Sequence, residues 1–99
     1  MRVIVKHPGQ HPRQWNIANT LESLESVIGG DIKITTLFED LAVICDKEGT
    51  IKGLPYNCEV CGIDFVGLIL FAGIKGGELI DIPGGLSAFQ TVFPCLWED

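Results

Sequence analysis

The sequence predicts an α+β fold with a mainly antiparallel sheet, a strand–strand–helix start, further strands and a short C-terminal helix. Three observations carry this prediction. The chain has 99 residues, which is room for one compact domain, so residues 1–99 are expected to form a single α+β domain. Apolar residues make up 46% and charged residues 20%, a balance that favours a packed core over a disordered chain. Short β-type runs separated by glycine and proline outnumber the two segments of helical pattern.

The first seventeen residues predict a β-hairpin. Residues 2–6 are a short apolar run bounded by cations, which is typical of a buried strand. Residues 7–12 contain two prolines and a glycine and therefore predict a turn. Residues 13–17 are expected to form the returning strand.

A helix follows, with recognisable signals at both ends. Asn19 is placed to cap the first free N–H groups, and Glu22 is placed to reach back as in a capping box. Gly29–Gly30 is expected to end the helix, with one of the two glycines in the left-handed conformation.

The apolar face of this helix is predicted from its spacing. Leu21, Leu24 and Ile28 fall at i, i+3 and i+7, and Val27 widens the face that they form. We expect this face to pack against the inner face of the sheet. The residues expected on that inner face are Val3, Val5, Ile32, Ile34, Val43 and Leu68.

The rest of the chain predicts mainly strands. They are expected at residues 31–38, 41–45, 50–54, 65–74 and 78–82, with turns at 39–40, 46–49 and 76–77, a bend at 54–57 and a loop through Cys58 and Cys61. Alternating polarity or β-rich composition supports the strands, and glycine, proline and charged clusters support the turns. Residues 86–93 predict a short helix that Pro94 stops.

The chain carries no visible export or membrane signal. The apolar run near the N-terminus is too short for a signal-peptide core. The longest apolar stretch, residues 66–74, is interrupted by glycine and is about half of what a membrane span needs. We therefore expect a cytoplasmic protein without a membrane partner, whose four cysteines are reduced thiols.

Three stretches together resemble a small family of domains of unknown function found in bacteria, phages and conjugative elements. They are the opening hairpin around residues 3–5 and 8–9, the helix from 20–22 to 27–30, and the turn 46–49 followed by 52–57. The resemblance covers roughly the first sixty residues well and the remainder loosely. Its most specific part is Gly53-Leu54-Pro55 with Asn57, and Cys58 stands where the family typically has a basic residue. The resemblance implies a mobile-element origin, and it supplies no catalytic residues because none are established for the family.

The charge distribution predicts a binding surface for a small anion. Seven basic against thirteen acidic residues give a net charge of −6, which argues against binding duplex nucleic acid. All charged side chains before Glu22 are cationic, however, and both histidines lie there. If the hairpin forms, Lys6, His7, His11 and Arg13 gather at its tip, with Trp15 nearby to stack on a base of a nucleotide-like ligand. The alternative is a solvated tip without a ligand.

Cys58 and Cys61 form the sharpest local motif. Two thiolates at this spacing can bind zinc, but a closed site needs four ligands, so Cys45, Cys95, His7 or His11 would have to supply the others. Glu59 between the sulfurs disfavours a thiolate and therefore redox catalysis. We expect unmodified thiols in a turn, with no metal and no cofactor, and keep a metal site at Cys58 and Cys61 as the alternative.

These observations favour a non-enzymatic binding or interaction module. Its expected partner is a protein of unknown identity or a small anionic ligand, and association with further copies of the chain stays open. No catalytic residues are predicted, because the chain has no serine elbow, phosphate loop or HExxH helix. The alternative function is a small hydrolase or metal-dependent enzyme that uses the Cys58/Cys61 region.

Overall fold

A computed structural model describes residues 1–38 and 40–98 of the chain. The elements in order are β1 (Arg2–Lys6), β2 (Arg13–Asn16), α1 (Leu21–Ile28), β3 (Ile32–Phe38), β4 (Leu41–Asp46), β5 (Tyr56–Val60), β6 (Ile63–Val66), β7 (Ile69–Lys75), β8 (Glu78–Ile80), α2 (Leu86–Val92) and the 3₁₀ helix η1 (Pro94–Trp97). The predicted α+β class, the strand–strand–helix start and the short C-terminal helix are confirmed. Of the predicted turn at 39–40, Glu39 lies outside the described residues. Neither α1 nor α2 is long and apolar enough to cross a membrane, and no other described segment forms such a helix.

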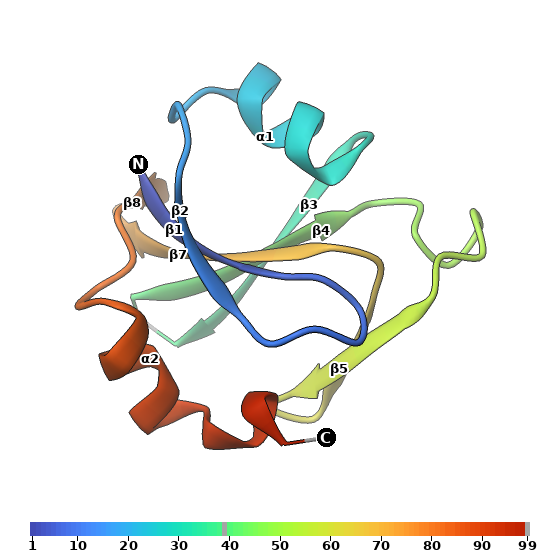
Figure 1. The fold of residues 1–99 in the computed structure, drawn as a ribbon. Helices are drawn as coiled ribbons and strands as arrows, with labels where there is room; N and C mark the ends of the chain where they lie inside the picture. Colours follow the sequence, from blue (N-terminus) through green and yellow to red (C-terminus); the bar gives the residue numbers. More distant parts are fainter. Residues whose placement is uncertain (39, 99) are drawn as a thin grey trace.

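The sheet has two covered faces. Its strand order is β2-β1-β7-β4-β3, with β8 paired to β7, and β5–β6 form a separate hairpin. The strand pairs are antiparallel, as predicted. Figure 1 shows α1 on one side of the sheet, and α2, η1 and β5 on the other. Antiparallel sheets commonly have one face exposed to solvent, but the central strands here are buried on both faces. This burial explains their nearly continuous apolar sequences.

Alternation along each strand divides the core in two. The α1 side is filled by Val3, Val5, Leu24, Ile28, Ile44, Leu70 and Ala72. The α2 side is filled by Ile4, Leu41, Val43, Val60, Phe65, Ile69, Phe71, Ile82, Phe89, Phe93 and Leu96. The expected inner face is therefore corrected at two positions: Val43 packs on the α2 side, and Ile34 is exposed on the edge strand β3.

The helix α1 differs from the prediction at its start. Thr20, not Asn19, is the N-cap, and its Oγ1 accepts a hydrogen bond from the Ser23 amide at 3.1 Å. Asn19 instead donates from Nδ2 to the Leu79 carbonyl at 2.9 Å. Glu22 is then the second helical residue and not the third, so the predicted capping box does not form. The helix ends as predicted, with Gly29 in the left-handed region at φ 91°.

The predicted apolar face of α1 is only partly buried. Leu24 is 4% exposed and Ile28 is buried, but Leu21 is 61% exposed. The helix has eight residues, about two turns, so the i, i+4 pair that faces the sheet is Leu24 and Ile28.

The middle of the chain holds the largest departures from the prediction. Residues 47–53 are successive turns and not a hairpin turn followed by a strand at 50–54. The predicted loop through Cys58 and Cys61 is the hairpin of β5 and β6, and Gly67 at φ 73° separates β6 from β7 where one strand was expected. Local turn bonds, such as Leu54 N–H to the Gly49 carbonyl at 3.0 Å, satisfy the backbone that a strand would have paired.

The glycine at position 73 lets the chain cross the sheet closely. A Cβ at Gly73 would collide with the Asp81 carbonyl oxygen and with Ile80. Because glycine has no Cβ, the segment after β8 can pass close over β7. Ile82 and Pro83 of this segment line the same groove as Phe89 of α2. The helix α2 then ends before Pro94, as predicted, and η1 follows.

Candidate functional site

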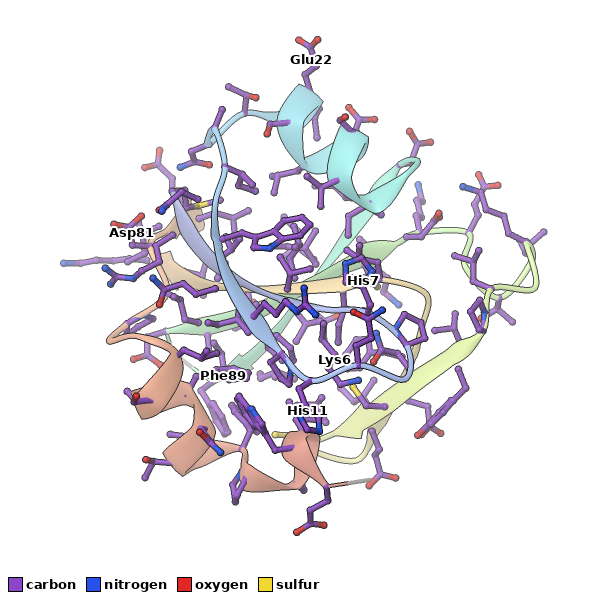
Figure 2. All side chains as sticks on the ribbon, viewed as in Figure 1. Lys6, His7, His11, Glu22, Asp81 and Phe89 are labelled. Carbon is purple, nitrogen blue, oxygen red and sulfur yellow. The ribbon has the colours of Figure 1, made fainter. Side chains whose placement is uncertain are left out.

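The predicted anion-binding residues lie on two sides of the β1–β2 hairpin. In the strand register Trp15 is opposite Val3 and Arg13 is opposite Val5, so both belong to the α1 side. The His7 ring meets the Trp15 ring edge-on, with 6.0 Å between centroids and 65° between planes. Figure 2 shows His7 between β1 and α1.

Lys6 faces the other way. It follows Val5 in β1 and therefore shares the α2 side with Ile4. Lys6 is only 5% exposed, and its Nζ donates to the His7 carbonyl oxygen at 3.1 Å. In Figure 2 the side chains of Lys6 and His11 lie toward η1, away from His7. The expected convergence of all four basic residues at one tip is thus corrected, and anion binding at the hairpin stays a prediction.

Asn57, from the most specific part of the family resemblance, joins three segments of the fold. Its Nδ2 donates to the Lys6 carbonyl at 2.8 Å and to the Gly67 carbonyl at 2.7 Å. Asn57 is the second residue of β5. These bonds therefore hold β5 against the end of β1 and against the β6–β7 connection. An amide NH₂ supplies two donors at one point, which explains an asparagine at this position.

The two cysteines of the Cys58/Cys61 motif lie on the β5–β6 hairpin. Cys58 lies on β5 opposite Phe65, and Cys61 lies in the β5–β6 turn at φ 51°. Burial raises the pKa of the Cys58 thiol, against the lowering effect of the nearby Lys6 ammonium. Burial likewise raises the pKa of Cys45. Within residues 1–38 and 40–98, no three His, Cys, Asp or Glu side chains gather as metal ligands.

A small polar cavity lies between β3–β4 and the β5–β6 hairpin. Its volume is about 140 Å³, and its lining includes Lys33, Thr35 and Cys45. Asp46 at its border is already satisfied: Oδ2 accepts from Lys52 Nζ at 2.7 Å and Oδ1 accepts from the Glu48 amide at 2.8 Å. These bonds hold the turns at residues 47–53 in place of the predicted strand, so Asp46 serves the fold.

The Asp46–Lys52 pair predicts an acid-sensitive contribution to stability. The hydrogen bond from Lys52 holds the pKa of Asp46 below its usual value, which is about 3.9 in an unfolded chain. The stabilisation is therefore present above that unfolded pKa and is lost as the pH falls through the folded-state pKa. Thermal unfolding measured between about pH 6 and pH 2 should show this loss, and Asp46→Asn should flatten that part of the profile. An unchanged profile in Asp46→Asn would contradict the assignment.

An apolar groove opens between α2 and the β3–β4 connection. Its volume is about 270 Å³. It is lined by Phe38, Asp40, Leu41, Ile82, Pro83, Ala88, Phe89, Val92 and Phe93. Figure 2 shows Phe89 between α2 and the sheet, where it forms the inner wall. Phe38 and Val92 are 49% and 62% exposed, so two large apolar side chains of this groove meet solvent.

A β-bulge turns Phe38 into the groove. Thr36 pairs with Ala42 and Phe38 pairs with Leu41, so Leu37 is the extra residue. Phe38 thereby takes the side of Leu41 and stacks on Phe93, with ring centroids 6.4 Å apart and planes at 26°. Bulges commonly re-aim a side chain next to a functional site. Sequence reasoning missed this groove because simple alternation places Phe38 on the opposite face from Leu37.

Comparison with known proteins adds the family. No curated protein and no solved structure matches the chain. The sequence matches the family described as "Domain of unknown function (DUF3846)" over residues 1–93, well beyond the first sixty residues that the resemblance covered closely. This match spans the hairpin, both helices and the complete sheet, and the chain therefore belongs to the DUF3846 family.

Proposed function

We propose that this chain is a non-enzymatic interaction module that binds a segment of a partner protein in the groove between α2 and the β3–β4 connection. The observation that carries the proposal is the open, almost wholly apolar lining of that groove, with Phe38 and Val92 exposed to solvent. Exposed apolar surface that is concave and contiguous marks interaction sites more often than scattered apolar residues do.

The size of the groove favours amino-acid side chains as its occupant. Its volume of about 270 Å³ is at the lower end of the range of about 300–1,000 Å³ usual for small-molecule and cofactor pockets. One or two aliphatic or aromatic side chains of a partner fit such a volume. Aromatic walls such as Phe38 and Phe93 are the surroundings in which buried anchor residues contribute most to binding.

The chemistry of the lining opposes an anionic ligand here. Among the described residues, Asp40 is the one charged residue that lines the groove, and no cation lines it. A nucleotide would meet this carboxylate without a compensating positive charge. A cytoplasmic location and a phage or mobile-element origin belong to this proposal as well, and both rest on the sequence alone.

The test is selection from a displayed library of random peptides on the intact chain. We expect enriched peptides with a shared apolar anchor, and Val92→Asp should weaken their binding about tenfold or more, because a carboxylate is placed in the apolar groove. Ile51→Asp is the matched control, since Ile51 is an exposed apolar residue outside the groove lining.

The outcomes separate clearly in calorimetric titration. Tight binding to the native chain and to Ile51→Asp, with loss in Val92→Asp, supports the groove. The absence of any enriched peptide overturns the proposal, as does equal binding to Val92→Asp. Thermal unfolding of both variants verifies that neither substitution acts through the fold, as expected for exposed positions.

A further inference from the structure

We infer that the partner segment binds as an additional strand along the outer edge of β3. The apolar side chain that follows its paired residues then occupies the groove. This inference rests on the proposed function and specifies the conformation of the bound partner. It joins two features that meet at Phe38: an unpaired sheet edge and the apolar groove.

The edge of β3 offers a row of backbone hydrogen-bonding groups. β3 is the last strand in the order β2-β1-β7-β4-β3, and among the described strands it pairs with β4 alone. In an antiparallel pair, alternate residues of an edge strand direct their N–H and C=O groups outward. An extended segment satisfies such a row residue by residue, as in strand addition to PDZ-type sheets.

The other free edges are poorer templates. β2 has four residues and follows Pro12, β8 has three, and β5 and β6 of the separate hairpin have five and four, whereas β3 has seven. Short strands and nearby prolines limit pairing with another chain. Among the described edges, β3 therefore provides the longest run of backbone groups for a partner.

The bulge connects this edge to the groove. Regular pairing with β4 runs from Ile32 to Thr36, and the register shifts before Phe38. A segment paired along Ile32–Thr36 therefore leaves the regular edge where Phe38 turns toward the groove. Its next side chain arrives beside Phe38 and Val92.

The charges near the groove favour a partner segment that carries a basic residue. Asp40 lies at the groove end of β3, and the whole chain carries a net charge of −6. A basic residue next to the apolar anchor complements Asp40, which lies beyond the opposite end of β3 from the exposed Lys33. A second copy of this chain would bring the same net negative charge to the interface. The occupant is thus an extended apolar segment with a neighbouring Lys or Arg.

The experiment uses the tightest peptide from the groove selection in two N-methylated forms. One form carries N-methyl groups at odd positions and the other at even positions. Each form therefore lacks one of the two alternating sets of backbone N–H donors, and only one of these sets faces β3 in a paired strand. Strand addition predicts that one form binds about tenfold or more weakly, because several inter-strand hydrogen bonds are lost, while the other keeps near-native affinity.

Amide hydrogen exchange on the intact chain supplies a second readout. The peptide should slow exchange at alternate amides of β3 about tenfold or more, and should leave the β2 amides unchanged. Equal affinity of both N-methylated forms, with no protection on β3 but loss of binding in Val92→Asp, overturns strand addition and leaves the groove proposal standing. A library without binders overturns both. Peptide-free dimerisation that protects the β3 amides assigns the edge to a second copy and also overturns the inference.

Discussion

Leu24→Ala is expected to lower the free energy of unfolding by about 2–5 kcal/mol, because it removes a buried side chain that α1 places against the sheet. The same truncation at Leu21, in the same helix, should cost less than about 0.5 kcal/mol, since that side chain is largely in water. For a domain of this size the first value is a large fraction of total stability.

Denaturant unfolding of the two variants side by side measures this contrast. Both substitutions replace leucine by alanine within one helix, so the difference in helix propensity cancels. Similar losses for Leu24→Ala and Leu21→Ala would contradict the observed burial and would restore the broader apolar face that the spacing predicts.

Asn57→Ala is expected to cost about 2–3 kcal/mol. The substitution removes both hydrogen bonds of the side-chain amide and leaves the partly buried carbonyl groups of Lys6 and Gly67 without that donor. The matched control is Asn19→Ala, which removes an exposed hydrogen bond to the Leu79 carbonyl and should cost about 1 kcal/mol or less.

Asn57→Asp tests whether donation, and not shape, is what matters. A carboxylate of similar size cannot donate to the two carbonyl groups, so this variant should be at least as unstable as Asn57→Ala. Urea unfolding of the three variants gives the comparison. Native stability in Asn57→Asp would show that the two hydrogen bonds contribute nothing.

The elements with strong local signals could be predicted from the sequence. The hairpin of β1 and β2, the end of α1 at Gly29 and the stop before Pro94 follow from backbone preferences of proline and glycine that act within a few residues. The family could likewise be identified from short stretches of sequence. Element order, which determines the α+β class, needs no knowledge of distant contacts.

The errors arose where two local solutions compete. Residues 47–53 have the composition of a turn and a returning strand, but the Asp46–Lys52 bond and turn hydrogen bonds hold them as successive turns. Thr20 and Asn19 are both good N-caps. The Asn19 side chain instead donates to the Leu79 carbonyl, sixty residues away in sequence, and Thr20 is the residue that caps the helix.

The candidate site depended on tertiary structure almost entirely. By itself the sequence determined the hairpin, the strand–strand–helix order, the helix stop signals and the family, because each is written in residues close together along the chain. Only the fold decided that Lys6 is buried and that Phe38 meets α2. The physical reason is that both depend on which face of a strand a distant segment covers, and a single bulged residue, Leu37, reverses that assignment for the residue after it.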